Sequence, residues 1–161
     1  MTDWREFRLR VFIDRPIEDI YEAWLSASQL ERWFIAKASF SDAEKKLLDR
    51  DKVVGNGARY QWEWAEGTIE KGEILIADGV SSFAFSFGKG CTVAVTLSRM
   101  DGRTLLELMQ THTMPDIERK QDFYVSCSQA WTFYLTNLKS VYEGGLDLRE
   151  RASVGAKLIN V

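Results

Sequence analysis

One histidine is the first candidate for acid–base chemistry, because histidine is the side chain whose ordinary pKa lies nearest to neutrality. His112 stands near the end of an alternating run, and Gln110, two residues earlier, falls on the same face of the predicted strand. The spacing places no carboxylate where it would orient the imidazole. A hydrogen-bonded structural histidine is therefore the plainer interpretation, and Gln110 is a second polar group that could orient a bound molecule.

Two cysteines and several charged clusters are the other residues that could react. Cys91 and Cys127 fall on apolar faces and lack the spacing of a zinc site, so we expect two buried thiols and no metal. Carboxylate pairs can hydrolyse glycosides, but strand alternation places several of the nearby glutamates on an outer, solvated face. These glutamates are Glu63, Glu66, Glu70 and Glu73. We also expect the clusters Glu44–Lys46 and Arg149–Arg151 to be solvated.

The composition limits the class of protein. The 161 residues, 45% hydrophobic and 28% charged, predict a single domain over 1–161, with a core over about 5–145 and a tail over 146–161. A net charge of −3 argues against nucleic acid as a partner. No apolar run is long enough to span a membrane, and the charged N-terminus does not resemble a signal peptide, so we expect a cytoplasmic protein. No motif for a cofactor is present.

The N-terminal third predicts one strand and two short helices. Residues 6–14 alternate between apolar and polar types, as a half-buried strand does. Apolar residues at helical spacing predict a helix over 16–26, and Ser28 is the expected N-cap of a second short helix. The segment 36–57 is the least regular part, and we expect a turn or two of helix within it at 45–49.

The rest of the chain predicts strands followed by a long helix. From 58 to 112, five alternating runs are separated by turn signals, with a bulge expected near Lys71–Gly72. A helix is expected over 118–143, after Pro115 and before Gly144–Gly145. Hairpin-linked strands form an antiparallel meander, so the sequence predicts an α+β fold: a six-stranded curved antiparallel sheet wrapped around the long C-terminal helix. The turns are predicted at Glu66–Gly67, Asp78–Gly79, Gly88–Gly90 and Asp101–Gly102.

The order and spacing of three segments resemble a known family. The segments are "IDRPIEDIYEAWLSASQLERWF", "VVGNGARYQWEW" and "SQAWTFYLTNLKSVYEGG". Together they resemble the AHSA1-like domains, named after the activator of Hsp90 ATPase homologue 1, within the START/Bet v 1-like (SRPBCC) superfamily. The resemblance implies the helix-grip fold. Two departures are Ala130, where the family often has glycine before the helix tryptophan, and the longer, more charged insertion at 36–57.

The fold and the many aromatic residues lead to one main hypothesis and two alternatives. A curved sheet around a helix leaves space for a small molecule, so we expect a non-enzymatic module that binds an apolar or aromatic ligand. The family name implies a chaperone-linked protein that stimulates an Hsp90-type ATPase, although we expect no partner domain here. The superfamily also implies a cyclase or dehydratase, and a homodimer is a further form that we consider. The expected ligand-binding residues are Tyr60, Trp62, Phe83, Phe85, Leu106, Leu108, Gln110, His112, Trp131 and Tyr134.

Overall fold

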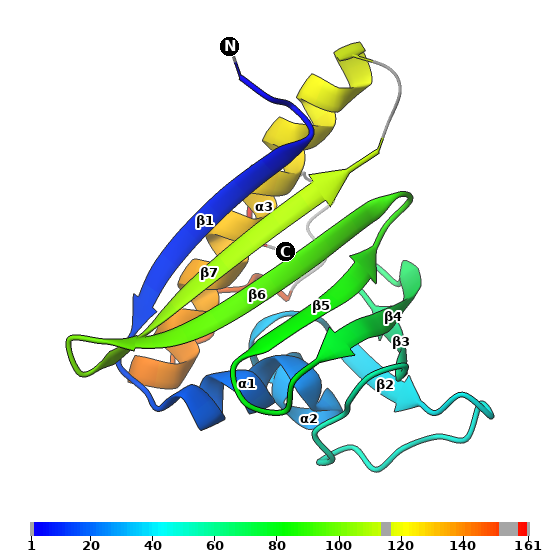
Figure 1. Cartoon of the computed structure of the whole chain (residues 1–161), viewed down its shortest axis with the longest axis vertical. Coiled ribbons are helices and arrows are strands. Elements are labelled where there is room, and N and C mark those ends of the chain that lie inside the picture. The colour runs from blue at the N-terminus through cyan, green and yellow to red at the C-terminus, as the bar shows by residue number, and fades with distance from the viewer. Residues whose placement is uncertain (1, 114–116, 152–157, 161) are drawn as a thin grey trace.

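Three helices and seven strands make up the part of the chain that the structure describes (Figure 1). The computed structural model describes residues 2–113, 117–151 and 158–160. In chain order its elements are β1 (Glu6–Ile13), α1 (Ile17–Leu25), α2 (Ala27–Trp33), β2 (Lys37–Ser41), β3 (Arg59–Glu63), β4 (Ile69–Ala77), β5 (Ser82–Phe87), β6 (Cys91–Met100), β7 (Arg103–His112) and α3 (Ile117–Gly144).

The strands form one antiparallel sheet in the order β1-β7-β6-β5-β4-β3-β2, which has one strand more than the sequence predicted. The additional strand is β2, within the segment that the sequence analysis treated as irregular. Its alternation is short, with only Ala38 and Phe40 buried, and pairing with β3 stabilises it. The helix expected at 45–49 is wrong: Lys45 has a positive φ of 67°, and Ser41 bridges to Leu47 across a tight turn.

Two local predictions are also corrected. The second helix begins two residues earlier than expected, because Ser26 is its N-cap and its hydroxyl oxygen accepts a hydrogen bond from Gln29 N at 3.3 Å. The irregularity in β4 lies at Ile74–Ile76 and not at Lys71–Gly72. Gly72 has another role, since a Cβ there would lie 2.4 Å from the ring of Tyr60. The aromatic ring, rather than a bulge, requires glycine at this position.

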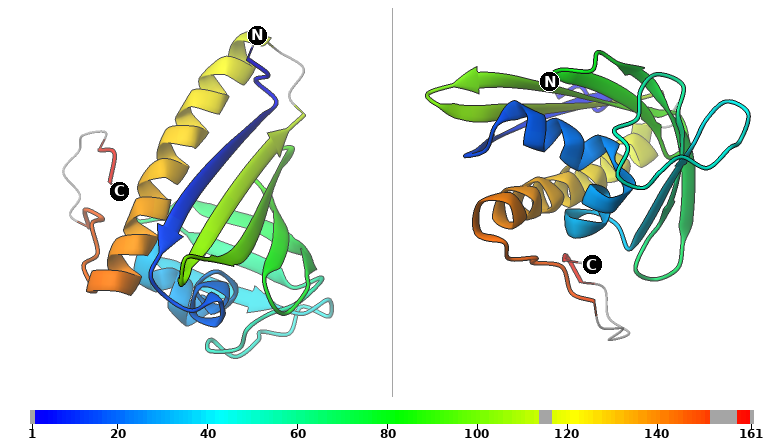
Figure 2. Two further views of the ribbon diagram at one scale, coloured as in Figure 1. Left: turned by 60° about the vertical axis from the view of Figure 1, so that its left-hand side comes forward. Right: turned by 90° about the horizontal axis from the view of Figure 1, so that it is seen from below.

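The long helix α3 lies on the concave side of the curved sheet, alongside β1 (Figure 2). This arrangement is consistent with the predicted helix grip. The buried side of α3 carries Trp131, Leu135 and Leu138 at helical spacing. Gly145 ends the helix with a φ of 77° and donates its N–H to Val141 O at 3.0 Å. Pro115, expected just before the helix, lies outside the described residues.

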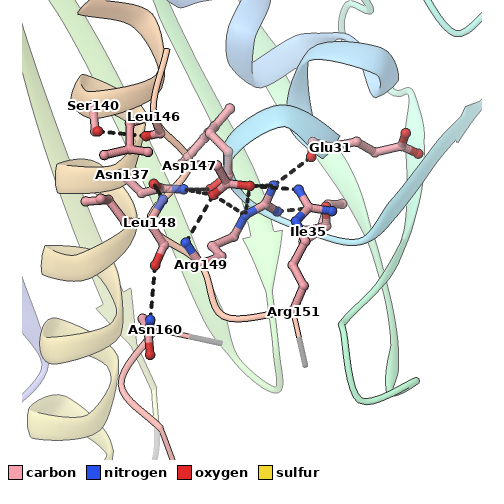
Figure 3. Close-up of polar contacts among 11 residues, drawn as sticks. Glu31, Ile35, Asn137, Ser140, Leu146, Asp147, Leu148, Arg149, Arg151 and Asn160 are labelled. Atoms are coloured by element: carbon pink, nitrogen blue, oxygen red, sulfur yellow. Dashed lines mark hydrogen bonds and ion pairs between the residues drawn. The ribbon is translucent and has the colours of Figure 1, made fainter. Parts of the chain in front are cut away.

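The segment after α3, residues 146–151, is tied to the end of α2, and we call it the strap (Figure 3). The guanidinium of Arg149 donates to the carbonyl oxygens of Glu31 and Ile35 at 2.8 and 3.0 Å. Glu31 O is one of the carbonyls that the last turn of a helix leaves free, and Ile35 follows the end of α2. It also pairs with Asp147 at 2.9 Å. The prediction that Arg149–Arg151 is solvated is therefore wrong for Arg149, whose side chain is only 6% exposed.

Asn137 of α3 holds the same strap from the other side (Figure 3). Its amide nitrogen donates to Trp33 O at 2.7 Å and to the Asp147 carboxylate at 3.0 Å, and its oxygen accepts from Leu148 N at 2.7 Å. Asn137 is fully buried, so these bonds satisfy an amide that would otherwise be costly to bury. The strap therefore joins α2 and α3, and the directly bonded Trp33 and Asn137 are 104 residues apart in sequence.

Candidate functional site

The ten predicted ligand-binding residues all lie on the inner side of the fold, between the sheet and α3. Each one is buried, and the most exposed of them, Tyr134, is 8% exposed. Eight come from strands β3, β5 and β7, and two come from α3. The alternation of the strands places these side chains on one face, which is the face that α3 covers.

Aromatic rings fill the centre of this inner layer. The ring of Trp131 stacks on Phe34 at 5.2 Å and lies 5.4 Å from Phe87. Its indole N–H donates to Gln110 Oε1 at 2.7 Å, so the amide fixes the rotamer of the tryptophan. Trp62 stacks on Tyr60 with 3.8 Å between ring centres. These rings contact one another closely. Binding of a ligand between them stays a prediction.

Three of the ten residues carry a buried polar atom that has no hydrogen-bond partner. These atoms are Trp62 Nε1, Gln110 Nε2 and His112 Nδ1. His112 Nε2 contacts the carbonyl oxygen of Trp4. A carbonyl only accepts, so Nε2 carries the proton and Nδ1 is left as an acceptor in the neutral ring. The inner layer thus contains unpaired donors on Trp62 and Gln110 and an unpaired acceptor on His112, and the indole N–H of Trp24 beside them is also unpaired. Each such group is costly to bury.

The sequence analysis missed residues from the two short helices and the end of β5 that complete this layer. Trp24 of α1 lies 5.7 Å from Trp131, and Phe34 follows α2 directly. The sequence analysis predicted the two short helices, but the spacing of their apolar residues gave no sign of these distant partners. Phe87 and Phe123 are half-buried and lie beside Trp131 and His112 respectively, at the border between the inner layer and solvent.

A separate groove of about 970 Å³ lies along the free side of β1. We call it the edge groove. None of the ten predicted residues lines it. Its walls include Phe7 and Leu9 of β1, Tyr124 and Phe133 of α3, and Leu148 and Ile159 of the C-terminal tail.

Comparison with known proteins identifies the family. Residues 14–143 match the model of the family described as Activator of Hsp90 ATPase homolog 1-like protein. The chain belongs to this family. The match covers most of the sheet and nearly all of α3, so it confirms the predicted resemblance. No curated protein gave a significant match to this AHSA1-like chain.

Solved structures share the fold of the AHSA1-like chain at low sequence identity. The protein SSP2350 from Staphylococcus saprophyticus has a TM-score of 0.70 at 14% identity, covering 89% of this chain and 96% of its own. The Aha1 dimer from Colwellia psychrerythraea has a TM-score of 0.69 at 16% identity, covering 87% and 97%. DynU16, a putative protein in the dynemicin biosynthetic locus, has a TM-score of 0.68 at 16% identity, covering 91% and 50%.

The acidic residues of this AHSA1-like chain are only partly solvated. Glu66 and Glu73 are exposed, as predicted, but Glu70 is half-buried. Its carboxylate accepts a hydrogen bond from Gly88 N at 2.7 Å, and burial raises the pKa of Glu70. Strand alternation could not predict this burial, because Glu70 lies in β4 and is covered by the turn between β5 and β6. Among the described residues, no group of three or more histidine, cysteine or acidic side chains could hold a metal ion.

Both cysteines of the AHSA1-like chain are free, and we expect them to react slowly in the native state. Cys91 is buried, which raises the pKa of its thiol to about 11. Cys127 is only half-buried, so the prediction of two buried thiols is wrong for Cys127, although this partial burial still raises the pKa of its thiol. The thiolate is the reactive form, so a colorimetric thiol reagent at pH 8 should modify the native protein slowly and find two thiols per chain after unfolding. One thiol or none after unfolding, or stoichiometric zinc by elemental analysis, would contradict this prediction.

None of the described helices combines the length and the apolar character that are needed to cross a bilayer.

Proposed function

We propose that this domain binds an apolar small molecule between the inner face of the sheet and α3, and that it carries out no reaction on it. The supporting observation is the set of unpaired polar atoms on Trp62, Gln110 and His112 inside an otherwise aromatic layer. Buried polar groups in folded proteins almost always have a partner, so unpaired ones need an explanation. A ligand that supplies the missing partners is one such explanation.

The same atoms restrict the chemistry of the ligand. Trp62 and Gln110 offer N–H donors, and His112 Nδ1 offers an acceptor. The surrounding rings favour an aromatic or aliphatic body. The ligand that fits best therefore has an apolar body and one polar end, such as a hydroxyl group, that accepts from Gln110 and donates to His112 on the same strand. Phe87 and Phe123, which are half-buried beside Trp131 and His112, are the side chains that we propose move to admit the ligand.

A binding role fits these residues better than catalysis. His112 is oriented by a main-chain carbonyl and not by a carboxylate, and the pKa of each thiol is raised rather than lowered. The alternative of an Hsp90-type ATPase stimulator comes from the family description and from the name of the Colwellia protein. That alternative predicts stimulation of a chaperone ATPase with no small molecule present, which a direct assay would detect.

Native mass spectrometry of the purified protein, before and after extraction with organic solvent, tests the proposal directly. A mass excess that disappears on extraction is expected, and the extract then identifies the ligand. Titration of the extracted protein with an environment-sensitive apolar dye gives a binding constant for the variants below. Failure of both the mass excess and the dye binding would refute the proposal.

We expect Phe85→Ala to weaken dye binding more than His112→Ala does. Phe85 contributes apolar ring area to the layer, whereas His112 contributes one neutral hydrogen bond, which is worth only about 0.5–1.5 kcal/mol net. Val80→Ala, at an exposed apolar residue in a turn, is the matched control and should leave binding unchanged. The reverse order, with a turnover abolished by His112→Ala and untouched by Phe85→Ala, would indicate an enzyme.

A further inference from the structure

The strand β1 lies at one edge of the sheet, and its hydrogen-bonding pattern shows which main-chain groups face outward. Arg5 O accepts from His112 N at 2.9 Å, so odd-numbered residues of this segment bond to β7. Alternation then turns the N–H and C=O groups of Glu6, Arg8, Arg10 and Phe12 toward the free edge. An open strand edge of this kind is a template for pairing with another strand.

The helix α3 forms hydrogen bonds to the outward main-chain groups at only one end of this edge. Lys139 Nζ donates to Phe12 O at 2.7 Å, and Glu143 accepts from Asp14 N at 2.7 Å. Toward the N-terminus of β1, the main-chain groups of Arg8 and Arg10 have no such partner within the described part of the chain. The edge groove lies beside this uncovered part, because Phe7, Arg8 and Leu9 all line it.

The side of α3 that lines the edge groove is suited to close packing. Ser128, Thr132 and Thr136 recur every four residues along it. Their hydroxyls already donate to Val125 O, Ser128 O and Thr132 O, so this face has few free donors to desolvate. Ile159 of the C-terminal tail, which also lines the groove, is 92% exposed. Covering this surface would therefore remove few unpaired hydroxyl donors from water.

We propose that a second copy of this chain covers the edge, with β1 pairing antiparallel to β1 of the other copy about a two-fold axis at Phe7. Charge selects this occupant and this register. The outward side chains of the edge are Glu6, Arg8 and Arg10 in a row. A two-fold axis at Phe7 sets Glu6 of each copy directly opposite Arg8 of the other, which gives two cross-strand ion pairs and sets no like charges directly opposite each other.

Neighbouring registers are worse for the same reason. An axis at Arg8 sets Arg8 opposite itself, and an axis at Leu9 sets Arg8 opposite Arg10. With the axis at Phe7, the two sheets become continuous and the small-residue faces of the two α3 helices approach each other across the joined edge grooves. This interface uses none of the ten residues of the proposed ligand site, so it can fail without affecting the proposed function.

Charge reversal at the two paired positions tests the interface in the full chain. We expect a dimer by analytical ultracentrifugation of the wild type. Arg8→Glu and Glu6→Arg should each raise the dimer dissociation constant by about tenfold or more, since each change places like charges opposite each other twice. The double variant should restore dimerisation. Lys71→Glu and Glu73→Arg, exposed on β4, are controls with the same changes in charge and should leave the dimer unchanged.

Hydrogen exchange supplies a second readout that does not depend on the variants. The amide of Arg8 should exchange slowly above the dissociation constant and fast below it, whereas the amide of Phe7, bonded to β7, should be slow in both. A wild type that stays monomeric at roughly 100 µM protein would overturn the proposal. A dimer in which the Arg8 amide exchanges fast would also overturn it. So would a double variant whose dimerisation is as weak as that of the single variants.

Discussion

Replacing Trp131 by alanine is expected to lower the free energy of unfolding by about 3–5 kcal/mol, the range for large aromatic-to-alanine changes in a core. Trp131 is 2% exposed, and its ring contacts Trp24, Phe34 and Phe87, which come from three different parts of the chain. The change leaves a cavity between the sheet and α3 and also frees Gln110 Oε1, which loses its donor.

Denaturant unfolding followed by circular dichroism measures the expected loss. Ser126→Ala, on the exposed side of the same helix, is the control and should change stability by less than about 0.5 kcal/mol. A loss of under about 1 kcal/mol for Trp131→Ala would mean that the inner layer closes around the gap. That result would contradict the central place given to this ring.

The second large effect is expected at the strap. Arg149→Met keeps an apolar side chain of similar length but removes the bonds to Glu31 O and Ile35 O and the pair with Asp147. Bonds of a charged group contribute about 1.5–3 kcal/mol each, so we expect a loss of about 2–4 kcal/mol in the free energy of unfolding. The loss should also loosen the end of α2, since Glu31 O in its last turn is left without a donor.

Arg151 is the matched control for Arg149. It bonds to the same Asp147 carboxylate at 2.7 Å, but its side chain is 63% exposed and contacts no carbonyl of α2 in the described contacts. Arg151→Met should therefore cost less than about 1 kcal/mol. Equal losses for the two variants would show that the charge on Asp147, and not the capping of α2, is what Arg149 provides.

The strap should also make stability depend on pH. Partial burial by itself would raise the pKa of Asp147, but hydrogen bonds from Arg149, Arg151 and Asn137 outweigh it and hold that pKa well below its usual range. A carboxyl with a lowered native pKa stabilises the fold above its unfolded value of about 3.9, and this contribution is lost as the pH falls toward the native pKa. The stability difference between wild type and Asp147→Asn should thus be largest near neutrality and shrink below about pH 4. A constant difference would refute this account.

The sequence alone determined the local and periodic features of this protein. Alternation gave β1 and the strands from Arg59 to His112, and three-to-four spacing gave α3 to within a residue at each end. Parity along the strands also predicted the buried inner face, including Gln110 and His112. These features follow from the geometry of a single strand or helix, so a short stretch of residues is enough to reveal them.

Only the tertiary structure decided what depends on distant partners. The strand β2 is stable because it pairs with β3, and its own five residues carry too weak a pattern to predict it. Phe34 stacks on Trp131, and Arg149 caps α2, across about a hundred residues of chain. The edge groove lies beside the part of β1 whose outward main-chain groups α3 does not bond. Contacts of this kind are set by the packing of whole elements, and the residue types at either end do not encode which partner they will meet.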